Sequence, residues 1–542
     1  MTVIRGGTVV DGTGAAAFPG DVVVEGDRVA DIVAPGAANG GGMRVVDASG
    51  CLVTPGFIDA HTHSDAYLVI EPDAPSKISQ GITTEINGQC GGSVAPRYGE
   101  ARLSSDWAAV LGDRLTWRSL AEYRSALAAA RPAVNTVQFI GHNTLRSSVV
   151  GYAGRAATPD ELKAMERMLA QALDEGGWGL TTGLIYQPGR YASPEEVVAL
   201  AKVAAERGGY YATHMRSEGD AILEAIDEVL ALVEATGIRA EISHLKTSGR
   251  RNWHKIDAVI DKIGRAVGEG RLLGSDRYPY CAAGTDLDIV LPDWAQEGAA
   301  KAEMERLADP ATRARIEDEV NASGRDWSTV MVGGTWSEEN RRYSGKTIAE
   351  ILRQETRDVV VASSQVSRLS PDPGSLVCSI LERDGCKTGA FFFGMSEENL
   401  AKIYSQPWIV PGSDASLRAP WGPLGKDHPH PRAYGTMPEF FRRLRALGIS
   451  REEAIARMTS VPARRFGIKG RGTIERGAFA DIAVWREADF RDVATYETPH
   501  AFAEGVELVM VNGHVPYRGG KFTGDRGGRF LESSGTRGTA HA

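Results

Sequence analysis

The sequence predicts an α/β protein: a (β/α)8 TIM-like barrel with a small β-sandwich domain assembled from both termini. Three observations lead to this fold class. Short apolar strand runs alternate with helical patterns through most of the chain, which is typical of a parallel sheet. Eight of these runs end in polar residues, and eight strand–helix units close a barrel. The first and last segments consist of short Val- and Ile-rich runs separated by Gly and Asp, a pattern that favours an antiparallel β-structure.

Val- and Ile-rich runs punctuated by Gly and Asp mark both ends of the chain. They read TVIRGGTVVDG and DVVVEGDRVADIV near the start, and ADIAVWR and VELVMVNGHVPYRGGKF near the end. Each end is short for an independent core, so we expect the two to pack together. The predicted domains are a small β-domain (1–54 with 466–530), a catalytic barrel (55–465) and a disordered tail (531–542).

A helix is clearly predicted in SPEEVVALAKVAAERGG, between two of the strand runs. Ser193 is a suitable N-cap, Pro194 takes the first helical position, Glu196 completes a capping box and Gly208 ends the helix. The segment TPDELKAMERMLAQALDEGG repeats this design. These helices supply the crossovers between parallel strands.

The eight candidate strands are FIDAHTH, TTEINGQ, NTVQFIGHNT, GLTTGLIY, GYYATHMR, RAEISHLK, LLGSDRYPY and WIVPGSDAS. Their polar residues fall at the carboxyl ends, where such barrels place their chemistry. The gap from Tyr280 to Trp408 is far too long for one crossover. We therefore expect an insertion at 287–400, between strands seven and eight, with its own secondary structure and the apolar runs DVVVAS and AFFFGM. We also advance the hypothesis that it covers the site as a lid.

Composition excludes several classes of protein. The 542 residues are 42% hydrophobic and 24% charged, as in an ordinary globular protein. The net charge of −9 argues against sequence-independent nucleic-acid binding, which needs a basic surface. No run is long and apolar enough for a membrane-spanning helix, and the start has no signal-peptide core. Five scattered cysteines suggest no disulfide framework, so we expect a cytoplasmic protein.

Four histidines end three of the predicted strands. His61 and His63 lie two apart at the end of the first strand, so both imidazoles face the same way. His214 and His244 end the fifth and sixth strands. Buried, hydrogen-bonded histidines are the alternative explanation, but four at equivalent strand ends favour a metal site.

Two further residues extend this cluster. Asp414 follows the eighth strand, although an Asp after Gly-Ser is also common as a helix N-cap or in a turn. Cys90, in NGQCGGS, follows the second strand, whereas the other cysteines fit the usual pattern of small buried hydrophobes. A set of Cys, His and Asp suits zinc better than Mg²⁺ or Ca²⁺, which prefer oxygen ligands.

PGFIDAHTH, the strand-end histidines and the Asp of the last strand resemble the amidohydrolase superfamily over nearly the whole chain. Within it, the chain most resembles the D-aminoacylases, the N-acyl-D-amino-acid deacylases. The segments that carry this resemblance are GITTEINGQCGGSVAP, GLTTGLIYQPGRYA, ATHMRSE, ISHLKTSG, YPYCAAGT and HPHPRAYGT. The fourth strand lacks the lysine that bridges two metals in many superfamily members.

The resemblance implies a metal set in which Cys90 replaces that lysine. It implies one tight Zn²⁺ at Cys90, His214 and His244, and a second, weaker position at His61 and His63 that shares Cys90. The reaction would be hydrolysis of an N-acyl-D-amino acid to a carboxylate and a free D-amino acid.

In this mechanism the catalytic residue is Asp414, which accepts a proton from water and returns it to the leaving amine. Zinc lowers the pKa of the attacking water, and with a histidine such as His61 or His63 it stabilises the oxyanion. The partner is thus a small-molecule substrate, and the oligomeric state stays open.

The resemblance also implies residues that bind the substrate. Lys246 and Arg432 occupy the positions that bind the α-carboxylate, Tyr280 donates a hydroxyl, and Tyr186 lines the pocket. Without the resemblance, the simpler interpretation of Lys246 and Arg432 would be that they form ion pairs or lie on the surface. The segment ASLRAPWGPLGKD, before HPHPR, looks longer than its family counterpart and is expected to reshape the pocket mouth.

Two other functions compete with the deacylase. One is hydrolysis of cyclic amides, in the manner of hydantoinases or dihydroorotases, against which Cys90 and the lysine-free fourth strand weigh. The other is a non-enzymatic scaffold on the same fold. Such scaffolds typically lose metal ligands, whereas this chain keeps them all.

Overall fold

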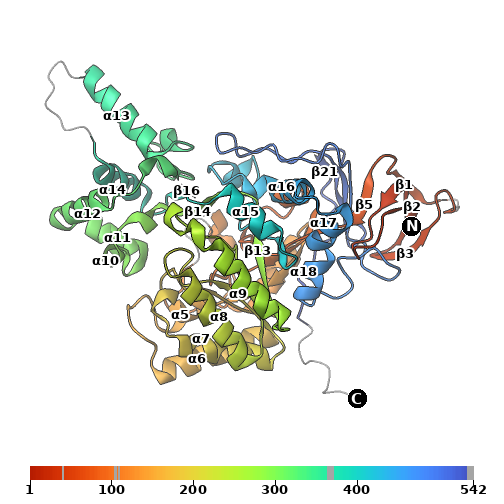
Figure 1. The fold of residues 1–542 in the computed structure, drawn as a ribbon, viewed down its shortest axis with the longest axis horizontal. Helices are drawn as coiled ribbons and strands as arrows, with labels where there is room; N and C mark the ends of the chain where they lie inside the picture. The colour runs from red at the N-terminus through yellow and green to blue at the C-terminus, as the bar shows by residue number, and fades with distance from the viewer. Residues whose placement is uncertain (39–41, 103–106, 108–109, 363–370, 534–542) are drawn as a thin grey trace.

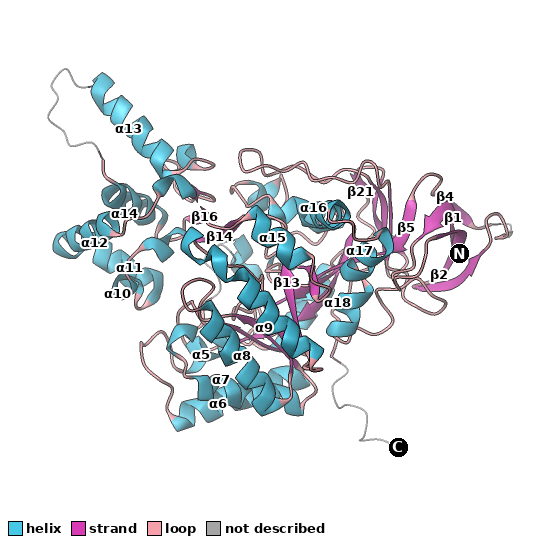
Figure 2. Cartoon of the chain, viewed as in Figure 1, coloured by secondary structure: helices cyan, strands magenta, loops and turns pink. Residues whose placement is uncertain are grey.

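The computed structural model describes residues 1–38, 42–102, 107, 110–362 and 371–533. Strands such as β13 lie in the middle of the molecule among helices, whereas β1, β2, β4 and β5 lie at one edge (Figure 2). The N-terminal strands and the C-terminal segment that pairs with them lie on one side, away from the helices α5 to α9 (Figure 1). No helix in the described part of the chain is both long enough and apolar enough to cross a membrane.

Strands from both ends of the chain form one nine-stranded sheet with the order β21-β20-β19-β18-β5-β1-β2-β3, in which β4 also pairs with β1. The bounds are β1 Thr2–Val9, β2 Phe18–Glu25, β3 Arg28–Val33, β4 Arg44–Asp47, β5 Leu52–Pro55, β18 Ile482–Trp485, β19 Val506–Val511, β20 His514–Arg518 and β21 Lys521–Phe522. The two ends of the chain meet where β5 and β18 pair antiparallel. All nine strands belong to a single hydrogen-bonded sheet, in which β1 pairs with β2 along one edge and with both β4 and β5 along the other. The predicted arrangement of this domain as a sandwich stays a prediction.

Each of the eight predicted strand runs contains a parallel strand. The bounds are β6 Phe57–Asp59, β7 Ile82–Asn87, β8 Asn135–Gln138, β9 Ile140–Gly141, β10 Gly179–Gly183, β11 Tyr210–His214, β12 Arg239–Ile242, β13 Leu273–Arg277 and β17 Ile409–Pro411. They form a three-stranded sheet, β6-β7-β8, and a six-stranded sheet, β17-β13-β12-β11-β10-β9. A parallel bridge between Thr62 and Ala415 and a 3.0 Å hydrogen bond from Ala60 N to Pro411 O connect β6 with β17. Every strand therefore points its carboxyl end toward the same region.

Helices follow most of these strands. The bounds are α1 Tyr67–Ile70, α2 Pro75–Ile78, α4 Leu120–Ala130, α5 His142–Val149, α6 Pro159–Asp174, α7 Pro194–Glu206, α8 Ile222–Thr236, α9 Ile256–Gly268, α15 Glu397–Tyr404, α16 Arg432–Ala446, α17 Arg451–Met458 and α18 Ser460–Arg465. Short 3-10 turns occur at Gly112–Arg114, Gly189–Tyr191, Arg250–Lys255, Leu287–Val290, Trp327–Thr329, Arg341–Tyr343 and Gly422–Gly425.

The predicted start of α7 is half correct. Ser193 caps the helix by accepting a hydrogen bond from Glu196 N, and Pro194 takes the first position. The Glu196 carboxylate, however, accepts from Arg146 and contacts His142 Nε2 at 2.9 Å. A buried cation attracts a carboxylate more strongly than a backbone N–H does. The Glu196 carboxylate therefore pairs with Arg146 instead of accepting the hydrogen bond from Ser193 N that a capping box requires.

Between β13 and β17 the chain forms a separate unit with its own core. An antiparallel sheet β14-β16-β15 packs against helices, and the bounds are β14 Ala282–Asp286, β15 Val330–Val332, β16 Gly389–Phe393, α10 Asp293–Gln296, α11 Ala299–Ala308, α12 Pro310–Ala322, α13 Ile348–Ala362 and α14 Pro373–Asp384. Its core includes Leu287, Val330 and Ile380. The helices α10 to α14 stand out from the rest of the molecule (Figure 1). Of the two apolar runs, AFFF lies in β16, whereas DVVVA ends the helix α13 and residue 363 lies outside the described residues.

The predicted tail begins in ordered chain. Leu531 N donates to Thr136 O at 2.8 Å, beside β8. Residues 534–542 lie outside the described part of the structure.

Candidate metal and catalytic site

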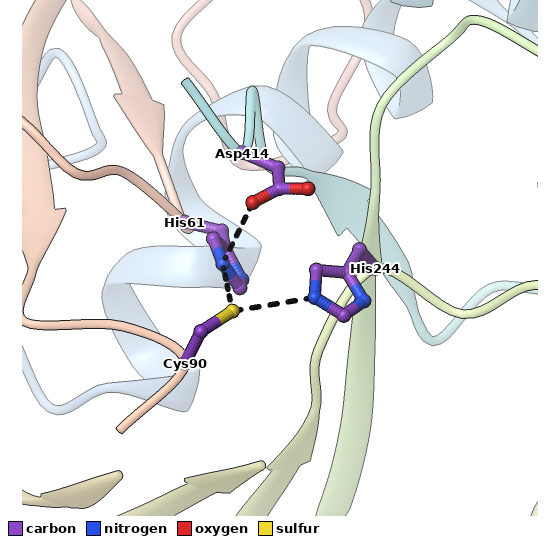
Figure 3. A group of neighbouring side chains, drawn as sticks. All are labelled: His61, Cys90, His244 and Asp414. Atoms are coloured by element: carbon purple, nitrogen blue, oxygen red, sulfur yellow. Dashed lines mark hydrogen bonds and ion pairs between the residues drawn. The ribbon is translucent and has the colours of Figure 1, made fainter. Parts of the chain in front are cut away.

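Four residues from four strand ends point toward one another at the centre of the molecule (Figure 3). His61 follows β6, Cys90 follows β7, His244 follows β12 and Asp414 follows β17. Their ligand atoms lie within 4.8 Å of one another. The parallel strands bring together residues that are hundreds of positions apart in the chain.

The backbone at this site adopts conformations that side chains usually avoid. Among the described residues, seven that are not glycine have positive φ, and three of them are Cys90 at 51°, His244 at 37° and Asp414 at 50°. Left-handed backbone at a non-glycine residue costs energy and concentrates at functional sites. Here each strand ends in a sharp turn that directs its side chain inward.

The thiol of Cys90 lies between two imidazoles. Its Sγ is 3.3 Å from His61 Nε2 and 3.3 Å from His244 Nε2. Burial alone would raise the pKa of this thiol, but the His61 and His244 imidazoles lower it well below its usual value. The thiolate, which is the form that binds metals, is therefore favoured.

His214 and Glu218 form a second group with His244. The imidazole of His214 lies 4.5 Å from that of His244, measured between ring centroids. Neither ring nitrogen of the buried His214 has a hydrogen-bond partner among the described residues, and its Nε2 is 3.6 Å from Glu218 Oε2. Glu218 was absent from the sequence prediction. The available signal was its place in ATHMRSE, four residues after His214.

The residues present fit a metal ion. A buried imidazole without partners and a thiolate between two imidazoles are the nitrogen and sulfur donors that zinc prefers. The predicted tight set was Cys90 with His214 and His244. In the structure Cys90 hydrogen-bonds to His61 and His244, while His214 neighbours His244 and Glu218. Cys90 and His244 thus lie between the two candidate positions.

A carboxylate behind the site orients two of these ligands. Asp276, on β13, has Oδ2 at 3.2 Å from His61 Nδ1, and its Oδ1 accepts a 2.9 Å hydrogen bond from His244 N. The contact with Nδ1 fixes the tautomer and the ring orientation of His61, whereas the bond from His244 N holds the backbone of that residue. The sequence prediction did not include Asp276, although it lies at the polar end of a candidate strand, in SDRYPY.

Asp414 faces the predicted cations and imidazoles. Its Oδ1 lies 3.0 Å from His63 Nε2 and 3.4 Å from His61 Nε2, and its Oδ2 accepts a 2.7 Å hydrogen bond from Arg432. Burial opposes ionisation, but the Arg432 guanidinium and the neighbouring imidazoles hold the pKa of Asp414 well below its usual range. The carboxyl group is therefore ionised and can accept a proton.

The second predicted cation is also close to the metal ligands. Lys246 Nζ contacts the Glu218 carboxylate and lies 2.8 Å from His244 Nδ1. Arg432 is thus paired with Asp414 and Lys246 with Glu218. Such ion pairs were the alternative to a substrate-binding role in the sequence analysis, and both lie beside the candidate ligand cluster.

The two tyrosines of YPY have different surroundings, and Tyr280, the predicted hydroxyl donor, is already engaged. Tyr280 donates its hydroxyl to Asp492 at 3.1 Å, on the C-terminal side of the chain. Tyr278 is fully buried, its hydroxyl has no partner among the described residues, and the Arg432 guanidinium lies 4.7 Å from its ring centroid. Residues two apart on an extended strand face the same side, but Pro279 follows the end of β13, and the two tyrosines diverge here. The ring of Tyr186 lies 4.9 Å from the His214 ring, measured between centroids.

The ligand cluster opens into a cavity of about 870 Å³. Its floor includes His63, Cys90 and Asp414, and Arg432 lies in its wall. The other walls come from the insertion (284–286, 334–336 and 389–391) and from the long loop after Asp414 (415–427). This volume suits a small-molecule substrate.

Comparison with known proteins gives a consistent result. A model of the amidohydrolase family matches residues 44–517. The N-acyl-D-glutamate deacylase of Alcaligenes xylosoxydans xylosoxydans is 35% identical over 94% of this chain and 92% of its own length. A solved D-aminoacylase with a binuclear metal centre has 32% identity and a TM-score of 0.80, covering 98% of this chain and 99% of its own.

The N-acyl-D-glutamate deacylase from Bordetella bronchiseptica, solved with zinc and a phosphonate inhibitor, has 32% identity and a TM-score of 0.79 over the same shares of both chains. The resemblance drawn from the sequence motifs is thereby confirmed. This chain belongs to the amidohydrolase family and, within it, to the D-aminoacylases.

Proposed function

We propose that this protein is a zinc-dependent hydrolase that cleaves the amide bond of N-acyl-D-amino acids and releases a carboxylate and a free D-amino acid. The observation that carries the proposal is the joint placement of a thiolate, imidazoles and an ionised carboxylate at the floor of one cavity, with Arg432 in its wall. The names of the relatives support the substrate class.

We infer that the nine parallel strand segments form a (β/α)8 barrel, with the insertion and the terminal sheet as additions. The bridge between Thr62 and Ala415 supports closure between β6 and β17, and the sequential pair β8 and β9 lies between the two sheets. We also propose the domain limits 1–54 with 466–530 for the small β-domain, 55–465 for the barrel and 287–400 for the insertion. A cytoplasmic location is a further proposal, and it agrees with the five cysteines, which all lie within the described residues and are unpaired.

The residues Cys90, His61, His214 and His244, with Glu218, would hold the metal. When bound, zinc would supply a Lewis acid that polarises the amide carbonyl and favours deprotonation of water. Asp414 accepts a proton from the attacking water and then donates it to the leaving amine nitrogen. His63, 3.0 Å from Asp414, lies beside this proton path.

The α-carboxylate of the substrate binds on the side of β12 and β13. Arg432 and Lys246 supply positive charge, and the unpartnered hydroxyl of Tyr278 donates a hydrogen bond. Arg432 donates to Asp414 through Nη1 and to Gly284 O through Nη2, and its Nε has no partner among the described residues. A substrate carboxylate that takes this guanidinium frees Asp414 Oδ2 for proton transfer.

The test is a panel of N-acetyl-D- and N-acetyl-L-amino acids, with zinc per chain measured on the same preparation. We expect zinc in the purified protein and release of amine from D-substrates only. Asp414→Asn should keep its zinc and lose at least about 100-fold in kcat, the usual contribution of a general acid–base group.

Two outcomes would contradict the proposal. Zinc without release from either enantiomer, but with opening of hydantoin or dihydropyrimidine rings, would indicate a cyclic amidohydrolase. A protein without zinc and without activity would indicate a scaffold. The absence of lysine from β10 favours the deacylase over the first of these.

A further inference from the structure

Gln89, immediately before Cys90, has a side chain that the catalytic mechanism does not use. It is 1% exposed and lies in the wall of the cavity. Neither its Nε2 nor its Oε1 has a hydrogen-bond partner among the described residues. A buried carboxamide without partners is destabilising, and native proteins keep very few. The position of Gln89 in the cavity wall indicates that its partner is a bound molecule.

The polar neighbours of Gln89 are already engaged. Ser93 Oγ donates to Ala95 O and accepts from Gly141 N. Thr144 Oγ1 donates to Ser93 O and accepts from Ser93 N. Gln89, by contrast, offers both a donor and an acceptor that no described residue uses.

The position of Gln89 identifies the part of the substrate that it meets. The α-carboxylate anchors Lys246 and Tyr278 follow β12 and β13, whereas Gln89 follows β7. The strands β17 and β6 lie between them, and these carry Asp414 and His61 at the reacting centre. In an N-acyl amino acid the scissile carbonyl separates the carboxylate half from the acyl half. This order of strands puts Gln89 and the carboxylate anchors on opposite sides of the reacting centre, so Gln89 is the residue expected to meet the acyl half.

Apolar and aromatic side chains line the same cavity as Gln89, together with the cations Arg102 and Arg418. Tyr67, Trp107 and Val110 line the same cavity, and the first two rings pack edge to face with centroids 5.8 Å apart. The cavity of about 870 Å³ is much larger than an acetyl group needs. An acyl group that reaches this wall should bring apolar surface together with one hydrogen-bonding group.

We propose that Gln89 selects acyl groups that contain a second amide, so that acylaminoacyl-D-amino acids are better substrates than plain alkanoyl-D-amino acids. An amide offers one donor and one acceptor, which complement Oε1 and Nε2 of Gln89. This inference rests on the proposed deacylase function and specifies its substrate class.

The test compares two acyl groups of equal shape on one D-amino acid, chosen as the best one in the N-acetyl panel. The acetylglycyl group carries a second amide, and the 4-methylpentanoyl group replaces that amide with carbon. For the wild type we expect kcat/KM at least about 10-fold higher with acetylglycyl, the effect of one satisfied buried polar group. Gln89→Met, which keeps the length but not the amide, should bring the ratio near one with zinc content retained. Gln89→Asn keeps the amide and should give an intermediate ratio.

A wild-type ratio near one overturns the inference, whether or not the variants fold. So does an equal loss on both substrates in a zinc-loaded Gln89→Met protein. Neither result touches the deacylase assignment, which depends on turnover of the N-acetyl-D panel. If the wild type turns over none of that panel, the proposed function and this inference fail together.

Discussion

At the scale of single residues, Cys90 connects the two candidate metal positions. Its thiolate is the only sulfur donor in the two ligand groups found among the described residues, and it lies 3.3 Å from imidazoles on two different strands. A change at this position should therefore affect both metal content and chemistry.

We predict that Cys90→Ser loses most of its zinc and at least about 100-fold in kcat/KM, because a hydroxyl stays protonated where the thiol ionises. Metal analysis and amine release measure the two effects. Cys281→Ser is the matched control, because burial raises the pKa of that thiol to about 12 and keeps it neutral. Equal zinc content in Cys90→Ser and the wild type would contradict the ligand assignment.

Tyr278 and Tyr280 provide a matched pair of variants. Tyr278→Phe removes the hydroxyl that lies unpartnered beside Arg432, so KM for N-acetyl-D-substrates should rise about 10-fold, the value of one hydrogen bond to a charged group. Tyr280→Phe loses only its bond to Asp492 and should leave KM near the wild-type value. Steady-state kinetics on both variants measure these KM values. A raised KM in Tyr280→Phe and an unchanged KM in Tyr278→Phe would support Tyr280 as the substrate-binding hydroxyl.

At the scale of elements, the insertion contributes both a wall of the cavity and a core of its own. Its strands β14 and β16 pair antiparallel from Ala282 with Phe393 to Asp286 with Gly389. The cavity contacts come from the ends of these strands and from residues 334–336. The helices beyond them are outside the cavity wall.

The pairing of Asp286 with Gly389 suggests how to remove the insertion. Replacement of residues 287–388 by Asn-Gly would join β14 and β16 as a two-residue hairpin. We expect this shortened protein to keep its zinc but to lose more than about 10-fold in kcat/KM, because part of the substrate-binding wall is gone. Unchanged kinetics in a folded, zinc-loaded deletion would remove the lid hypothesis.

Two neighbouring acids make the insertion sensitive to pH. Burial, followed by mutual repulsion, raises the pKa of Asp288 to about 7, and burial raises the pKa of Glu303 to about 7. In the unfolded chain these carboxyl groups lose their protons above an ordinary pKa of about 4. In the folded chain they keep their protons up to about pH 7. The stability that these protons confer is complete below about pH 4 and is lost as the pH rises through about 7.

We therefore predict that the insertion is less stable at pH 8 than at pH 5. Glu303→Gln should raise the melting temperature at pH 8 by about 2–4 °C and change it less at pH 5, because only the ionised pair repels. Thermal unfolding at the two pH values, with hydrogen exchange in α11, measures the effect. A shift of equal size at both pH values would mean that the gain comes from packing rather than from charge.

At the scale of the whole molecule, the metal site joins strand ends that are remote in sequence. A ligand that binds the folded chain and not the unfolded chain stabilises the fold by mass action. Removal of zinc by a chelator should therefore lower the melting temperature by several degrees, and added zinc should restore it. Cys90→Ser should respond little to either treatment; a wild type that melts at one temperature with and without chelator would argue against a bound ion.

Much of this architecture was predictable because its signals are local. Alternating strand and helix patterns placed the eight parallel runs, and the cap at Ser193 marked the start of α7. The long gap after Tyr280 indicated the insertion. An error arose where a local pattern met a distant partner, because the Glu196 carboxylate pairs with Arg146 instead of completing the capping box.

The family and the chemical types at the site could be predicted from the amino-acid order: imidazoles, one thiol and one carboxylate at strand ends. Those features follow from residue order and from the periodicity of single elements. Which side chains meet depends on the folded chain. It brought Glu218 to His214, placed Asp276 behind His61 and set Tyr278 rather than Tyr280 beside Arg432. The reason is physical, because contacts between strands depend on register and on the turn at each strand end, and neither is encoded in any single segment.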